Sequence, residues 1–353
     1  MASRCCSLSR TTCLSGAALV LCAAAIGLNL GMPAWRTAMA RSAITQRGGQ
    51  VYTLPGGAQG LRSVLGDQAM QVFDEIVGVY LPDAQDDDLA VIGGLPTVRT
   101  VSADAHHLTN AGLAHLRDLK ELTLLSLGDS QIDDNGLISL ESLQNLTVLQ
   151  LDNRRDSRIS DEGMMHLGGL HKLQHLQLIG AQVKGDGLRF LHKLTDLESL
   201  NLSGSPLRDD GMVHLASLKS LKNLNLNRTQ VTDAGLAQLA GLVDLETLSL
   251  AGTQIGDPGM PHLAKLKNLR ILNLNETKIT DAGLVHLAGL ANLNSLGLGF
   301  TQIDDRGLMH LQGLPNLAML NLTEAHVSRA ERERFIEECP RCEIVTDGMT
   351  WPN

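Results

Sequence analysis

The chain has 353 residues, of which 43% are hydrophobic but only 2% are aromatic. This length and apolar content allow a sizeable core, and the scarcity of aromatic residues means that leucine must fill it. The formal net charge of −9 argues against a general nucleic-acid binder, because such a protein needs a basic surface to meet the phosphates.

Residues 1–40 predict a signal peptide or a membrane anchor. Arg4 and Arg10 precede the apolar run Leu14–Leu28, and the small-residue motif Ala38-Met-Ala40 follows it. A basic start, a short apolar run and an A-x-A site are typical of a secretory signal peptide. The uncharged residues 14–32 are also nearly long enough for an uncleaved anchor. We therefore expect an extracytoplasmic protein (secreted, periplasmic or membrane-anchored), with a cytoplasmic location as the alternative.

Two further segments precede the regular part of the chain. Residues 41–57 are rich in glycine and proline, which predicts a linker. Residues 58–97 predict an N-terminal cap and a degenerate repeat, with a short helix over Leu61–Glu75 and a strand over Val77–Leu81. Such a cap is needed because the open end of a stacked fold exposes core.

Residues 98–327 repeat themselves at a nearly fixed interval. The repeat is marked by a glycine, at Gly112, Gly136, Gly163, Gly187, Gly211, Gly235, Gly259, Gly283 and Gly307. Successive spacings are 24, 27 and then 24 six times. A fixed period of this size is typical of a solenoid built from stacked supersecondary units.

Each repeat predicts a short strand followed by a helical turn. Leu224 and Leu226 alternate as on one face of a strand, and spacing by three from Leu236 to Leu242 indicates a helical stripe. Asp233 is the predicted N-cap of that helix, because its carboxylate can accept from free N–H groups. The equivalent predicted caps are Asn110, Asp134, Asp161, Asp209, Asp257, Asp281 and Asp305.

The sequence from Leu221 to Leu236 reads L-x-x-L-x-L-x-x-T-x-V-T-D-A-G-L. This pattern resembles the leucine-rich repeat, in the variant found in F-box/leucine-rich-repeat proteins and in many bacterial repeat proteins. The resemblance extends from about Val77 to Val345. It implies an α/β fold: a right-handed leucine-rich-repeat solenoid, with a parallel β-sheet on the concave side and short helices on the convex side.

Residues 328–353 predict a C-terminal cap, with a charged helix over Arg329–Glu338. Cys339 and Cys342 follow this helix. In an exported protein they could form a small disulfide, and unpaired thiols are the equal alternative.

A row of histidines is the strongest candidate for metal chemistry. Histidine recurs three residues after the marker glycine, and His262, His286 and His310 belong to consecutive repeats. Metal binding would need these rings to converge on one point, whereas a half-exposed helix position duplicated with the repeat explains the row without a metal, and we favour this second interpretation. We expect no metal, no cofactor and no catalytic residue.

The predicted strands place one polar row across the concave sheet. It consists of Ser126, Gln150, Gln177, Asn201, Asn225, Ser249, Asn273, Gly297 and Asn321. The 27-residue spacing adds a loop after the strand Leu146–Leu151, and insertions of this kind often lie on the binding face. The candidate partner-binding residues are Gln150, Arg154, Arg155, Arg158, Gln177, Asn201, Asn225, Asn273 and Phe300.

These features together predict a non-catalytic protein–protein interaction module that is exported and presents a concave binding surface. The partner would be another protein and not a nucleic acid, and membrane contact would come only through residues 14–32 if they stay uncleaved. The alternative is a substrate-receptor adaptor of a ubiquitin-ligase complex, as the resemblance to F-box/leucine-rich-repeat proteins implies. A metal-dependent enzyme is a third candidate that rests only on the histidine row.

Overall fold

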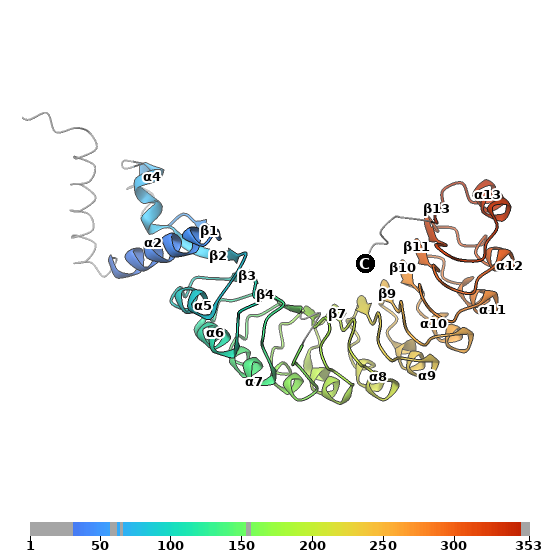
Figure 1. The fold of residues 1–353 in the computed structure, drawn as a ribbon, viewed down its shortest axis with the longest axis horizontal. Coiled ribbons are helices and arrows are strands. Elements are labelled where there is room, and N and C mark those ends of the chain that lie inside the picture. Colours follow the sequence, from blue (N-terminus) through green and yellow to red (C-terminus); the bar gives the residue numbers. More distant parts are fainter. Residues whose placement is uncertain (1–30, 57–61, 64–65, 153–156, 347–353) are drawn as a thin grey trace, which may run out of the picture.

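The protein is described by a computed structural model that covers residues 31–56, 62–63, 66–152 and 157–346. These residues form a curved solenoid, with the strands lining the inner side of the curve and the helical segments lying outside (Figure 1). Thirteen strands of the described chain make one sheet in sequence order, parallel from β2 onward. The predicted solenoid is therefore confirmed.

The strands are five to seven residues long near the N-terminus and three residues long from β6 onward. Their bounds are β1 Gln50–Leu54, β2 Glu75–Leu81, β3 Thr100–Asp104, β4 Leu124–Gly128, β5 Val148–Asp152, β6 His175–Gln177, β7 Ser199–Asn201, β8 Asn223–Asn225, β9 Thr247–Ser249, β10 Ile271–Asn273, β11 Ser295–Gly297, β12 Met319–Asn321 and β13 Glu343–Val345.

The segments outside the sheet are short α-helices and 3₁₀ turns. The α-helices are α2 Gly31–Gln46, α4 Asp67–Met70, α5 Asp86–Gly93, α6 Asn110–Ala114, α7 Asp134–Leu137, α8 Asp209–Leu215, α9 Asp233–Leu236, α10 Met260–Leu263, α11 Asp281–Leu284, α12 Asp305–Leu308 and α13 Arg329–Glu338. The 3₁₀ turns are η1 Gln71–Phe73, η2 His115–Asp118, η3 Ile138–Leu140, η4 Gly163–His166, η5 Asp186–Lys193, η6 Ala237–Gly241, η7 Asp257–Gly259 and η8 Val285–Leu287.

Leucine forms a continuous core between the two layers. Leu224 and Leu226 point inward from β8 and its exit, and Leu236, Leu239 and Leu242 meet them from the helical side; all five are buried. The equivalent leucines of neighbouring repeats belong to the same cluster. A single repeat cannot bury such a face alone, so stacking supplies the stability.

The predicted helix caps are wrong by one residue. Thr232 is the N-cap of α9, and its side chain accepts from the backbone N–H of Ala234. The corresponding caps with a bonded side chain are Thr109, Asp133, Thr280 and Asp304. Asp233, the predicted cap, is the first helical residue. The prediction failed because threonine and aspartate are both good capping residues and stand side by side in the motif.

The displaced aspartates link each repeat to the next. Asp233 Oδ1 accepts from the backbone N–H of Gly256 at 2.8 Å, and Asp257 accepts from both the N–H and the hydroxyl of Thr280. The same link is made by Asp86 to Thr109, Asp134 to Ser160, Asp161 to Gly185, Asp209 to Thr232, Asp281 to Asp304 and Asp305 to Ser328. We call this set the aspartate ladder.

The aspartate ladder explains the marker glycine in six of the nine repeats, those of Gly112, Gly163, Gly235, Gly259, Gly283 and Gly307. A Cβ atom on Gly235 would lie in hard contact with Asp209 Oδ1, and one on Gly283 would meet Asp257 Oδ1 at 2.5 Å. Close approach of a neighbouring group is one of the situations that require glycine. The 24-residue period therefore records a contact between neighbouring repeats.

The N-terminal cap differs from the predicted linker over residues 41–57. Residues 41–46 belong to α2, and β1 pairs antiparallel with β2. Ala40 and Ile44 of α2 are buried in the core cluster, and α2 packs on η1, β1, β2 and α5. The predicted apolar run Leu14–Leu28 lies outside the described residues. Within the part that is described, no helix combines the length and apolarity that a bilayer crossing needs.

The C-terminal cap follows the expected pattern. Phe335 of α13 is fully buried and covers the last leucines, while the other face of the helix carries charge, as in the exposed pair Arg329–Glu333. The strand β13 adds to β12 in parallel register. Cys339 and Cys342 are free thiols in the structure rather than a disulfide.

Candidate partner-binding surface

The predicted polar row is confirmed in register across the concave sheet. Ser126 lies opposite Gln150, which lies opposite Gln177, and the pairing continues through Asn201 and Asn225. It then runs through Ser249, Asn273, Gly297 and Asn321. Parallel in-register strands thus align one side chain of each repeat along the sheet.

Asparagines in this row are held by their own backbone. The Oδ1 atom of Asn225 accepts from the N–H of Asn227 at 3.0 Å, and that of Asn273 accepts from Asn275 at 3.1 Å. Asn201 and Asn321 make the same bond to the residue two positions ahead. With the oxygen engaged, the half-buried Asn201 and Asn225 keep their amide N–H donors for a ligand, whereas Asn273 and Asn321 are buried. The row is therefore a preorganised set of donors.

A second set of asparagine bonds supports the turns after β8 and β10. Asn227 Oδ1 accepts from the backbone N–H of Ala251 at 2.7 Å, and Asn275 Oδ1 accepts from Gly299 at 2.6 Å. These contacts join neighbouring repeats on the concave side, opposite the aspartate ladder. They fix the turn of one repeat to the turn of the next at these two positions.

The predicted binding loop is only partly described. Arg154 and Arg155 lie outside the described residues, whereas Arg158 is exposed and forms a parallel bridge with Asp133. Gln177 donates to both carboxylate oxygens of Asp152 at 2.9 and 2.8 Å, at the start of the same loop. Gln150, opposite Gln177 in the sheet, is half-buried.

One row of the N-terminal third of the concave face is largely apolar, which the sequence prediction missed. Tyr52 of β1 pairs with Gly78 of β2 and lies across it. The equivalent residues on β3, β4 and β5 are Thr100, Leu124 and Val148, which continue the same row. Tyr52 is 57% exposed. Tyr80 occupies the neighbouring row, opposite Ser102. Because β1 was interpreted as a linker, the clustering of the chain's two tyrosines on one surface was not recognised.

The corner after β4, and after each strand from β6 to β12, bends through left-handed backbone. Eight described residues hold this position with positive φ; they are Asp129, Gly180, Gly204, Arg228, Gly252, Glu276, Phe300 and Glu324. Phe300, one of the predicted binding residues, therefore projects from a corner rather than from a strand. It is 56% exposed.

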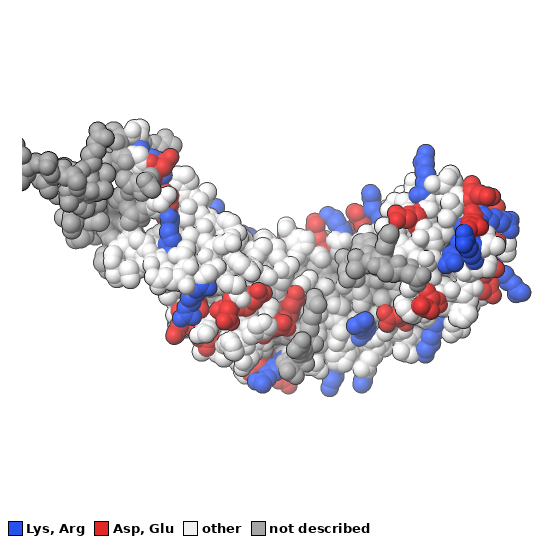
Figure 2. All heavy atoms as spheres, turned by 45° about the horizontal axis from the view of Figure 1, so that its top comes forward, with Lys and Arg blue, Asp and Glu red and all other residues white. Residues whose placement is uncertain are grey.

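Charge is mixed over the surface in view, without a continuous basic or acidic area (Figure 2). At the strand entrances, Lys222 pairs with Glu198 at 2.9 Å and Arg270 with Glu246 at 3.4 Å. The Glu198 hydrogen bond raises the pKa of Lys222, and the same bond lowers the pKa of Glu198. Exposed pairs like these contribute little to stability.

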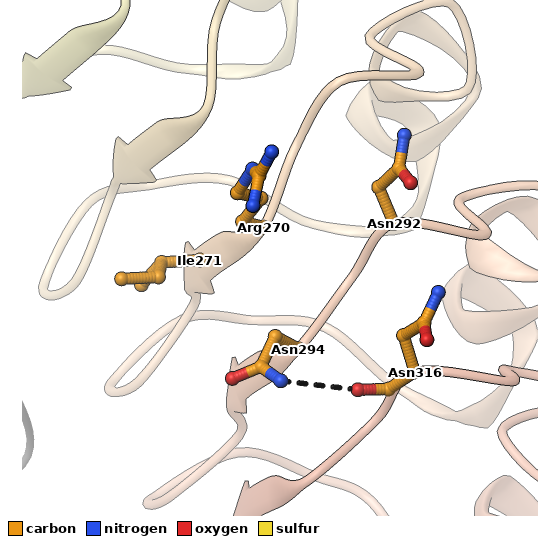
Figure 3. Close-up of a pocket in the computed structure, with 5 residues that line it drawn as sticks. All are labelled: Arg270, Ile271, Asn292, Asn294 and Asn316. Carbon is orange, nitrogen blue, oxygen red and sulfur yellow. Dashed lines mark hydrogen bonds between the residues drawn. The ribbon is translucent and has the colours of Figure 1, made fainter.

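A shallow cavity of about 430 Å³ lies beside the start of β10. Figure 3 shows that Asn292 and Asn316 lie one repeat apart in equivalent turns, with Asn294 bonded to the Asn316 carbonyl. The amides of Asn292 and Asn316 donate to Lys267 and Ala291 carbonyls. These side chains hold turns in place, and the cavity has no nucleophile, general base or carboxylate in its lining.

The histidine row and the cysteines offer no catalytic arrangement among the described residues. No group of three or more histidine, cysteine or acidic residues in that part of the chain could hold a metal ion. His262, His286 and His310 are half-buried on the helical side. Burial raises the pKa of Cys342 to about 12 and also raises that of Cys339, so both stay as unreactive thiols at neutral pH.

Comparison with known families supports the repeat pattern. A family model described as Leucine Rich repeat matches four segments, residues 193–216, 217–240, 243–264 and 265–288. Among curated proteins, none matches the sequence significantly.

Several solved structures are similar to this chain. An internalin (InlF) from Listeria monocytogenes is 22% identical, covers 83% of this chain and 94% of its own, and has a TM-score of 0.53. An internalin C2 of the same organism is 28% identical over 61% of this chain and 84% of its own, with a TM-score of 0.48. A repeat protein from Leptospira interrogans is 23% identical over 76% of this chain and 75% of its own, with a TM-score of 0.47. The likeness to the first of these shows the solenoid fold alone.

Proposed function

The chain is a leucine-rich-repeat protein, and from this premise we propose that it binds another protein through its concave face and catalyses no reaction. Repeat solenoids typically use their concave surface for binding. The partner meets strands whose positions are fixed by the stacked core, so little ordering is needed when the complex forms.

The asparagine row is the observation that carries this proposal. Asn201, Asn225, Asn273 and Asn321 are each held by a backbone N–H on Oδ1, which fixes the orientation of the amide group. Asn201 and Asn225 are half-buried and open to a partner, whereas Asn273 and Asn321 are buried in the free protein. A ladder of oriented donors suits the carbonyl and carboxylate acceptors of a protein surface. Tyr52 and Tyr80, at the N-terminal end of the concave face, add aromatic side chains of the kind that dominate interface energies.

We also propose that the protein acts outside the cytoplasm with residues 31–40 still attached. The motif Ala38-Met-Ala40 lies inside α2, and Ala40 and Ile44 are buried against the rest of the cap. Cleavage after Ala40 would divide that helix and expose apolar core at the end of the solenoid. N-terminal sequencing of the exported protein tests this: a mature terminus at Arg41 would contradict retention, and a cytoplasmic protein would contradict export.

Affinity capture with two matched variants tests the binding function. The concave variant Ser199→Lys/Thr247→Lys places two charges on β7 and β9, where both side chains are half-buried on the open face. The convex variant Val213→Lys/Val285→Lys places two charges at exposed positions of the helical side. Each is compared with the unmodified full chain after circular dichroism has shown that both fold.

We expect the concave variant to lose the partners that the unmodified chain and the convex variant retain. Equal retention by both variants would place the binding surface elsewhere. Capture of no partner by the unmodified chain, under conditions where the chain is folded, would contradict the proposal itself.

A further inference from the structure

Five corner positions border the C-terminal half of the concave face. They follow strands β8 to β12 and are Arg228, Gly252, Glu276, Phe300 and Glu324, which we call the corner row. All have φ between 55° and 69°, in the left-handed region. Residues other than glycine rarely adopt this conformation, because Cβ crowds the following carbonyl oxygen. For a bulky side chain such as that of Phe300 it is an outlier.

The fold does not need large side chains at these corners. Gly180, Gly204 and Gly252 make the same turn in other repeats without strain. The large side chains gain little burial in return, because Phe300, Glu276 and Glu324 are all exposed. Strain that is neither required by the turn nor compensated by packing indicates positions kept for a function.

We propose that the corner row docks a basic amphipathic helix of the partner protein, with an apolar side chain on Phe300 and cationic groups on Glu276 and Glu324. This inference rests on the proposed binding function and names the surface and the partner chemistry for it. The aromatic ring stands between two carboxylates one repeat away on either side. Such an order is complementary to an apolar side chain between two cations, which the ring face also attracts.

The spacing of the corner row favours a helix over an extended segment. Neighbouring strands lie about 4.8 Å apart, so Glu276 and Glu324 are separated by roughly 10 Å along the row. Residues i, i+3 and i+7 of a helix lie on one face and span about 10.5 Å. Side chains on one face of an extended chain recur about every 6.6 Å, which matches the row less well.

Arg228, at the first position of the corner row, should weaken the binding of a basic helix rather than support it. Its Cγ lies over Gly252, and its Nη2 reaches within 4.0 Å of Glu276 Oε1. Both side chains are exposed, so this contact is weak and a partner can replace it. Arg228 therefore competes with an incoming cation for Glu276, and its removal should strengthen binding of a basic helix.

A designed peptide provides the probe. We would titrate the full chain with a labelled, helix-stabilised alanine peptide that carries lysine, leucine and lysine at i, i+3 and i+7. Its controls are a permuted peptide, with the three residues at i, i+2 and i+5, and a peptide with glutamate in place of lysine. We expect the first to bind most tightly. Equal binding by the permuted or the acidic peptide, or no binding by the first, would overturn the inference.

Variants of the corner row should change the affinity for the lysine peptide in opposite directions. Phe300→Gly should weaken binding of the lysine peptide about tenfold or more, as truncation of a hot spot does. Glu324→Gln should weaken it and reduce its salt dependence, whereas Arg228→Ala should strengthen it. Met309→Ala, at an exposed position of the helical side, should leave the affinity unchanged. Affinities that fail to move in these directions would contradict the docking.

Thermal unfolding tests the strain argument independently of any ligand. Alanine keeps the Cβ atom that opposes the left-handed turn, and glycine removes it. We expect the Tm of Phe300→Gly to exceed that of Phe300→Ala and to be no lower than that of the unmodified chain. A Tm of Phe300→Gly several degrees below the unmodified chain would show that Phe300 is retained for stability, and the inference would fail.

Capture separates this inference from the function on which it rests. If Phe300→Gly retains the captured partner while Ser199→Lys/Thr247→Lys loses it, the concave face binds and the corner row does not. If neither the unmodified chain nor any variant captures a partner, both the proposed binding function and the docking on the corner row are contradicted.

Discussion

Asp209 in one repeat accepts two hydrogen bonds from Thr232 in the next, one from the backbone N–H at 2.8 Å and one from the hydroxyl at 2.5 Å. Thr232 in turn caps α9 by accepting from the N–H of Ala234. One carboxylate therefore fixes the residue that starts the next helix. The same bond recurs along the chain, so the aspartate of one repeat positions the helix start of the next.

Removing this carboxylate should destabilise the solenoid. Asp209→Ala leaves the N–H of Thr232 without its partner, and we expect a loss of about 1–3 kcal/mol in the free energy of unfolding. Urea denaturation measures it. Asp244→Ala, at an exposed loop position, is the control and should change stability by less than about 0.5 kcal/mol. Equal losses for both variants would mean that the ladder contributes nothing specific.

The marker glycine should be coupled to the same carboxylate. Gly235→Ala would place a Cβ atom against Asp209 Oδ1, and overpacking of this kind costs about 1–3 kcal/mol. In the Asp209→Ala background the tightest obstruction is gone and only the contacts with Val231 and Met212 remain, so the cost of Gly235→Ala should fall. A double-mutant cycle measures the coupling. Strict additivity would show that the glycine is needed for another reason.

Stability at acid pH should depend on Asp133. The side-chain amide of Asn110 donates to Asp133 at 2.7 Å and lowers the pKa of the carboxyl in the folded protein. A lowered folded pKa gives stability that is complete above the ordinary value of about 3.9 and is lost as pH falls through the folded value.

The matched variant for this prediction is Asp133→Thr, because threonine caps the equivalent helices at Thr109, Thr232 and Thr280 without titrating. Tm measured from pH 6 to pH 2.5 should fall less in the variant than in the unmodified chain. Asp244→Asn, as a control for the loss of one exposed carboxyl, should follow the unmodified chain. Parallel curves for all three proteins would exclude a contribution from Asp133.

Concave side chains should differ in their effect on stability according to their hydrogen bonds. Asn273 is 4% exposed and accepts from the N–H of Asn275, so Asn273→Ala should cost about 1 kcal/mol or more. Thr247→Ala lies on the same face without a side-chain bond in the described structure and should cost less than about 0.5 kcal/mol. Leu248→Ala, a buried truncation, should cost about 2–5 kcal/mol. Urea denaturation that ranks Thr247→Ala with Asn273→Ala would contradict this assignment.

Most of the solenoid could be predicted from local periodicity. Leu224, Leu226 and Leu236 repeat at spacings that specify a strand and a helical turn, and the polar row from Ser126 to Asn321 follows from alternation along each strand. The helix caps were missed because the decisive fact is a contact between repeats. Sequence alone cannot show that Asp209 reaches Thr232, 23 residues ahead.

The sequence predicts an N-terminal cap over residues 58–97 but not the part of it that α2 and β1 form, for a different reason. Gly48 and Gly49 suggest a flexible linker, but the chain uses them to turn from α2 into β1, and Gly48 has φ 77°. Tyr52 then joins the concave face by antiparallel pairing, which no period of the repeat predicts. The corner row is likewise invisible in the sequence, because a left-handed phenylalanine at position 300 goes against its ordinary conformational preference.

The central claim, that the concave face binds a protein partner, is tested most directly by site-specific photo-crosslinking. A photoreactive amino acid placed at Thr247 on the concave face, or at Val285 on the convex side, reports which surface lies against the captured partner. The account predicts a crosslinked product from position 247 and none from position 285. A product from position 285 alone would contradict it.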